Sequence, residues 1–196
     1  MNALADAKVG DYVNDHYVAS FLKVGTFTIA NGAKQGGNVA TYFCLPDGSV
    51  LHGIAGPVDA AQFLKEARWV VETRKLAIFE AQGNPARYRE FIRHAHAERL
   101  TKDHGVALFS RNARVQANLM RQLPNGELFP DATDPMQFHR LQAVLQQQAG
   151  GRVQDNQAKV HQLMANYPLV KIEQVYRYVF ERILGEQIST APVAQN

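Results

Sequence analysis

The sequence predicts an α+β or α/β-like protein, with a small sheet and helices followed by an all-helical C-terminal half. Two apolar runs, at residues 39–45 and 50–55, flank the turn signal Pro46-Asp47-Gly48. This pattern is typical of two strands joined by a tight turn. An amphipathic helix follows Gly56-Pro57, and from residue 75 onward the pattern changes from strands to helices.

The N-terminal residues predict one helix and one further strand before the hairpin. Leu4, Val9 and Val13 recur at helical spacing. Residues 17–25 then carry apolar side chains on both faces, as in a strand that is covered on both sides. The glycine-rich residues 31–38 indicate a loop.

The helix after the hairpin has a recognisable start. Asp59 is the expected N-cap, and Gln62 lies three residues later in a capping-box-like pair. The apolar positions that follow form one broad stripe: Ala60, Phe63, Leu64, Ala67, Val70 and Val71. Trp69 lies at the edge of this stripe, where we expect partial burial.

Caps and glycines delimit the later helices. Asn84-Pro85 and Gly105 mark the two ends of one helix, whereas Ser110 and Asp134-Pro135 each start another. The clearest helix follows Pro168 and ends at Gly185. Its expected buried positions are Ile172, Val175, Val179, Phe180 and Ile183.

These patterns divide the chain into a sheet domain at residues 1–74, a helical region packed on it at residues 75–185, and a flexible tail at residues 186–196. The junction at residues 72–82 is charged and apolar, unlike a flexible tether. Three of its side chains are expected to be buried there: Leu76, Ile78 and Phe79.

Residues 4–74 resemble part of a thioredoxin-like domain, in the order helix, strand, short loop, strand, strand, helix. The resemblance implies that a redox Cys-x-x-Cys motif would lie at residues 1–4, which contain no cysteine. It also implies a cis-proline before the hairpin, where the chain has Gly37-Asn38. The resemblance therefore implies a thioredoxin-like fold that lacks thiol–disulfide chemistry.

Composition favours an ordinary globular protein of 196 residues, 46% of them hydrophobic. The net charge of +3 is a weak argument for nucleic acid, which needs many clustered phosphate contacts. No apolar run approaches the ~20 residues that span a bilayer. Because no secretory signal is visible in the first ten residues, we expect a cytoplasmic location, although a chain cut from a longer secreted precursor would look the same.

The candidate reactive groups favour structural roles. Cys44, the single cysteine, falls within a buried strand, where a thiolate is disfavoured. The loop at residues 32–37 leads into a strand, so no helix N-terminus backs it as a phosphate cradle.

Histidine supplies the remaining candidates for a metal site. His94 and His96 point about 200° apart on a helix and cannot bind one ion together. Glu90, His94 and Glu98 share a face, which we expect to be solvated. We therefore assign no catalytic residue, no cofactor-binding residue, no metal ligand and no cofactor.

The function expected from these patterns is that of a non-catalytic, thioredoxin-like interaction or scaffold protein without redox activity. We expect a protein partner or a homo-oligomer, and neither nucleic acid nor a membrane. The alternative is an enzyme or a small-ligand-binding protein whose pocket lies between the sheet domain and the helical half.

Overall fold

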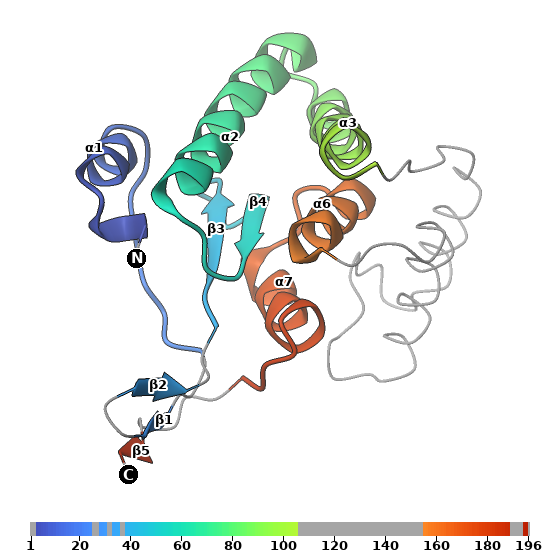
Figure 1. Ribbon diagram of the computed structural model, residues 1–196. Helices are drawn as coiled ribbons and strands as arrows, with labels where there is room; N and C mark the ends of the chain where they lie inside the picture. The colour runs from blue at the N-terminus through green and yellow to red at the C-terminus, as the bar shows by residue number, and fades with distance from the viewer. Residues whose placement is uncertain are drawn as a thin grey trace.

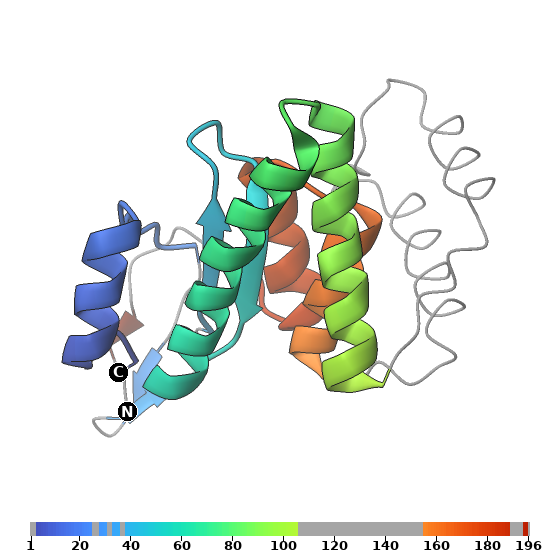
Figure 2. The ribbon, with the colours of Figure 1, turned by 90° about the horizontal axis from the view of Figure 1, so that it is seen from above.

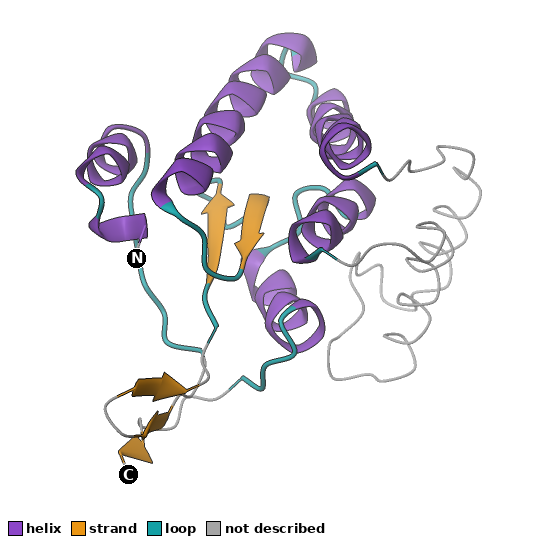
Figure 3. Ribbon diagram, in the orientation of Figure 1, coloured by secondary structure: helices purple, strands orange, loops and turns teal. Residues whose placement is uncertain are grey.

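The computed structural model describes residues 3–24, 28–30, 33–35, 38–105, 155–188 and 194–195. It is an α+β protein, as expected, in which helices pack around a two-stranded antiparallel sheet, and a second, mixed sheet of three short strands lies apart from them (Figures 1 and 3). None of the described helices is both long and apolar enough to cross a membrane. The expected helix starts at Ser110 and Asp134-Pro135 lie outside the described residues.

The described elements follow the chain in this order: a 3-10 turn Ala3–Ala5, α1 Ala7–His16, β1 Thr28–Ala30, β2 Ala33–Gln35, β3 Ala40–Cys44, β4 Val50–Ala55, α2 Ala60–Ala81, α3 Pro85–His104, α6 Asn156–Asn166, α7 Ile172–Tyr178 with its π-helical continuation Val179–Ile183, and β5 Ala194–Gln195.

The predicted hairpin is formed by β3 and β4, which pair antiparallel with Phe43 opposite His52. Its turn closes as the sequence predicts. The side chain of Asp47 accepts a hydrogen bond from the backbone N–H of Ser49, and Gly48 takes a φ of +80° that favours glycine. Five of the six residues of β4 are buried, because helices cover both faces of this strand.

Two hydrophobic clusters enclose the hairpin. The first contains Val50 of β4 with residues of α6, α7 and the π-helical segment. The second contains Phe43, Leu51 and Ile54 of the hairpin with residues of α1, α2 and α3. Figures 1 and 2 accordingly show the hairpin between α2 and α7.

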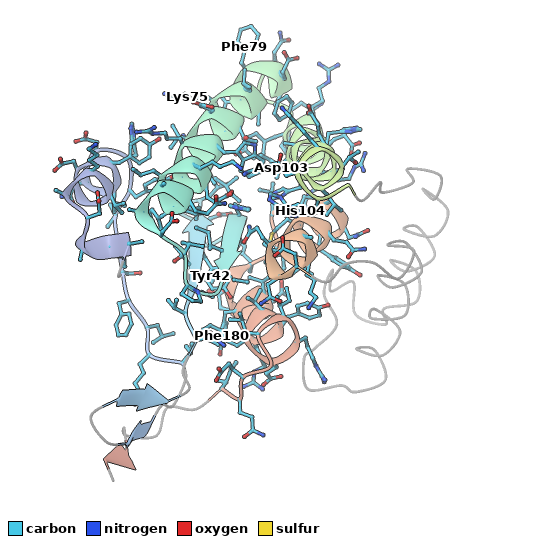
Figure 4. All side chains as sticks on the ribbon, in the orientation of Figure 1. Tyr42, Lys75, Phe79, Asp103, His104 and Phe180 are labelled. Carbon is cyan, nitrogen blue, oxygen red and sulfur yellow. The ribbon has the colours of Figure 1, made fainter. Side chains whose placement is uncertain are left out.

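Helix α2 continues ten residues beyond the apolar stripe that predicts it. It passes through residues 74 and 75, so the expected boundary between two domains falls inside a helix. The expected burial of Leu76, Ile78 and Phe79 is wrong, because all three are exposed, Phe79 by 73%. Small side chains, Ala77 and Ala81, face inward instead, and Figure 4 shows Phe79 at the outer end of α2.

The strand expected at residues 17–25 is also wrong for the described residues 17–24, which form an extended segment without strand pairing. Tyr17 is anchored by its hydroxyl, which donates a hydrogen bond to the carbonyl of Ala67 at 2.8 Å. Beyond it, Val18, Phe21 and Leu22 are exposed. The apolar residues on both faces of this segment predicted a buried strand, but in the described part of the chain no neighbouring strand covers them.

The predicted helix ends are confirmed where they are described. Asp59 caps α2 through Gln62, Asn84 caps α3 ahead of Pro85, and Gly105 ends α3 at a φ of +67°. In the last helix Val175, Val179, Phe180 and Ile183 are buried as expected, whereas Ile172 is only half-buried.

Candidate metal centre

Three histidines that are far apart in the sequence meet at the contact of the hairpin with the helices. His52 comes from β4, His96 from α3 and His161 from α6. Each side chain is 0% exposed, and one ring nitrogen from each lies within 4.8 Å of the others. The ring centroids are 4.9 to 5.4 Å apart. We call these residues the histidine cluster.

Local structure explains why each imidazole faces inward. His52 lies in a strand that is covered on both sides, with its ring stacked on Phe43. His96 shares the buried face of α3 with Ile92, Arg99 and Leu100, at helical spacing. His161 is in the middle of α6, where seven of eleven residues are buried.

Trp69 of α2 forms one wall of the cluster. Its ring centroid lies 5.0 Å from those of His52 and His96 and 5.6 Å from that of His161, in edge-on arrangements. On the same indole, the guanidinium of Arg99 lies 4.7 Å from the ring centre. This indole is half-buried, as the sequence predicts for Trp69, and it separates the cluster from solvent.

A buried ion pair adjoins the cluster. Arg99 donates two parallel hydrogen bonds to the carboxylate of Glu66, at 2.6 and 2.8 Å, and Gln62 donates a third at 2.7 Å. His52 Nε2 lies 3.1 Å from the same carboxylate. Burial raises the pKa of Glu66, but the hydrogen bonds from His52 and Arg99 outweigh it and lower the pKa to about 2. Glu66 is therefore ionised.

The hydrogen-bond partners assign the tautomer of each histidine. His52 Nε2–H donates to Glu66, which leaves the lone pair on Nδ1. Gln157 Nε2, 3.3 Å from the same ring nitrogen, donates instead to the carbonyl of Gly53 at 2.9 Å. His96 Nε2–H donates to the carbonyl of Leu51 at 2.8 Å, so its Nδ1 accepts from Nδ1–H of His161 at 2.9 Å.

Two buried ring nitrogens have no hydrogen-bond partner among the described residues: His52 Nδ1 and His161 Nε2. Both are lone-pair nitrogens in the tautomers assigned above. Burial lowers the pKa of His52 and of His161, and lowers that of His96 to about 3. The cluster is therefore neutral and presents lone pairs, the state in which imidazole binds metal ions.

The donor set fits a transition metal such as zinc, which favours imidazole nitrogen at about 2.0–2.1 Å. Tetrahedral coordination at that length places ligand nitrogens about 3.4 Å apart. The observed separations range from 2.9 Å, between Nδ1 of His96 and Nδ1 of His161, up to 4.8 Å, so binding requires movements of about an ångström. Ligation through Nδ1 of His161 also requires its proton to move to Nε2, the nitrogen without a partner among the described residues.

The outer partners also match a metal site, because ligating histidines usually donate their second N–H to a carboxylate or a carbonyl. His52 does so to Glu66 and His96 does so to Leu51. These hydrogen bonds hold the proton on Nε2 of each ring, so the lone pair that can bind a metal ion is on Nδ1.

A polar cleft of about 680 Å³ lies beside the cluster. Glu66 and Gln157, which contact His52, line it. His104 lines the cleft as well, and its ring centroid lies 5.8 Å from that of His161. Nδ1 of His104 pairs with the carboxylate of Asp155 at 2.9 Å. Figure 4 shows Asp103 and His104 at the end of α3 beside α6.

Apart from His96, the candidates considered from the sequence lie elsewhere. Glu90, His94 and Glu98 are exposed, as expected, and Glu90 pairs with Arg93 and His94. Cys44 is half-buried at the end of β3, and burial raises its thiol pKa to about 11.

None of the histidine cluster was singled out as a ligand from the sequence. A signal was present, since His52 and Glu66 interrupt apolar patterns that predict burial, and His96 follows Ile92 by one helical turn.

Family models, curated proteins and solved structures were compared with the chain, and none of them matches it.

Proposed function

We propose that this protein binds a divalent transition-metal ion, with zinc as the reference ion, through His52, His96 and His161. The observation that carries the proposal is that three fully buried imidazoles each place one ring nitrogen within 4.8 Å of the others, and that His52 Nδ1 among them has no hydrogen-bond partner in the described chain. A buried polar atom without a partner costs about 1–3 kcal/mol, and a bound ion would remove that cost at His52 Nδ1.

The site would link three parts of the fold. Its ligands come from the hairpin, from the helix that follows α2, and from α6. An ion bound by all three would hold these elements together, so binding should stabilise the folded state.

Trp69 makes the proposal directly testable, because it is the only tryptophan of the chain and touches all three imidazoles. Titration with Co²⁺ should quench its fluorescence at one equivalent, and Zn²⁺ should compete. Zn²⁺ should also raise the melting temperature of the wild-type protein.

The variants His52→Gln and His161→Gln should each weaken Co²⁺ binding by more than about tenfold, as expected for the loss of a ligand. His94→Gln is the matched control, because His94 is exposed on the same helix as His96 and should leave binding unchanged. A wild-type protein that neither quenches nor gains stability with either ion would refute the metal centre.

We further propose that the metal centre belongs to a thioredoxin-like interaction or scaffold protein without redox activity. The antiparallel β3–β4 hairpin beneath α2 supports the resemblance, and the raised thiol pKa of Cys44 disfavours the thiolate that redox exchange requires. Catalysis of insulin reduction by dithiothreitol that is lost in Cys44→Ser would contradict this role.

A further inference from the structure

We propose that the metal centre keeps one coordination position for an exogenous small anion, which enters from the cleft beside Glu66 and His104. This inference rests on the proposed function. The ligand class is a small monoanion, such as hydroxide, azide or a short carboxylate.

The first argument is the number of protein donors. Within the described part of the chain, the histidine cluster supplies three possible metal ligands and is joined by no fourth histidine, cysteine or carboxylate at ligand distance. Structural zinc sites use four protein ligands, whereas sites with three protein ligands bind water or another exogenous ligand at the fourth position. The cluster has the composition of the second type.

The second argument is charge. The three ligands are neutral, so they leave both positive charges of the ion in place. Glu66 cannot compensate them, because it is already engaged by the guanidinium of Arg99 through two hydrogen bonds. A buried charge is costly unless it is paired, and a monoanion at the fourth position would supply the missing negative charge.

The third argument is access. Fully buried histidines need a route by which a ligand can arrive, and residues that line the cleft contact two of them. Glu66 and Gln157 connect its wall to His52, and His104 connects it to His161. Its volume of about 680 Å³ leaves room for a small anion and its hydration water.

The test uses the full chain loaded with Co²⁺, whose visible absorption reports its coordination. Azide added to the cobalt protein should change the absorption bands in a saturable manner, and acetate should compete with azide. The same response is expected in the His94→Gln control.

The outcomes separate this inference from the metal proposal. If Co²⁺ produces no absorption bands and no quenching of Trp69, the metal centre itself is refuted. If the cobalt bands form but azide leaves them unchanged, the metal centre stands and the open position is refuted.

The route through the cleft has its own matched pair of variants. Lys65 lines the cleft, 3.8 Å from Asp103, whereas Lys75 lies on the same helix away from it (Figure 4). Lys65→Glu should weaken azide binding several-fold by repulsion at the entrance, and Lys75→Glu should leave it unchanged. Equal azide affinity in the two cobalt-loaded variants would overturn the cleft as the route.

Discussion

At the scale of single residues, Glu66 is the group on which the arrangement of the site depends. Its carboxylate receives hydrogen bonds from a β-strand histidine, from Arg99 on α3 and from Gln62 on its own helix. It thereby fixes the tautomer of His52 and holds Arg99 against Trp69. A residue with so many buried partners should be far more sensitive to substitution than an exposed glutamate.

Glu66→Gln should lower the free energy of unfolding by up to about 3–5 kcal/mol, because it removes the buried, two-oxygen counter-ion of Arg99 and leaves only the partly exposed Asp103, 3.0 Å from Nε of Arg99. Glu90→Gln is the matched control, since Glu90 also binds an arginine through two oxygens but is 53% exposed. We expect that control to change the stability by less than about 1 kcal/mol. Urea unfolding of the two variants measures the difference, and similar losses in both would contradict a special role for Glu66.

At the scale of the elements, caps and turns could be predicted from the sequence because they depend on neighbouring residues. Asp59, Asn84 and Gly105 define helix ends through contacts within a few positions, and the structure confirms each. The burial of helix faces was less predictable. The apolar side chains of Leu76 and Phe79 are exposed, because which face of α2 is covered depends on where α1, α3 and the hairpin pack.

Phe180, which is buried, and Phe79, which is exposed, provide a test of how helix faces are buried. Phe180→Ala should destabilise the protein by about 3–5 kcal/mol, because Phe180, in the π-helical continuation of α7, is only 4% exposed. Phe79→Ala removes the same atoms from an exposed position and should change the stability by less than about 0.5 kcal/mol. Denaturant melts compare the two variants, and a loss below about 1 kcal/mol for Phe180→Ala would contradict its burial in the core.

At the scale of the whole molecule, the histidine cluster could not be predicted, because its members belong to different elements and meet only after folding. The helical analysis correctly separated His94 from His96, but it offered no partner for His96 from another part of the chain. His52 and His161 lie on a strand and on a helix that each could be expected to be buried. Only their packing against α3 shows that three buried imidazoles share one place.

The metal-free protein should lose stability as the pH falls. Burial lowers the pKa values of His52, His96 and His161 below the unfolded value of about 6.5, to about 3 for His96. Between these values the unfolded chain binds protons that the folded chain does not. Each such histidine therefore lowers the free energy of unfolding by up to about 1.4 kcal/mol per pH unit below about pH 6.5.

Thermal or urea unfolding with a chelator present, from about pH 7 to about pH 5, measures this slope. His96→Gln should reduce it by about one third, because one of three titrating groups is removed, whereas His94→Gln should leave it nearly unchanged. A stability that stays constant over this range would show that the cluster is not neutral in the folded protein.

The direct contact between His96 and His161 has a consequence for how the chain can vary. Sixty-five positions separate these residues, and their ring nitrogens lie 2.9 Å apart. An ion bound by both would turn the intervening chain into a closed loop, and the entropy of closing a loop grows only logarithmically with its length. Doubling such a loop costs about 0.6 kcal/mol, less than the loss of one buried contact. Insertions between Gly105 and Asp155 should therefore be tolerated, whereas the spacing inside α3 and inside α6 should not.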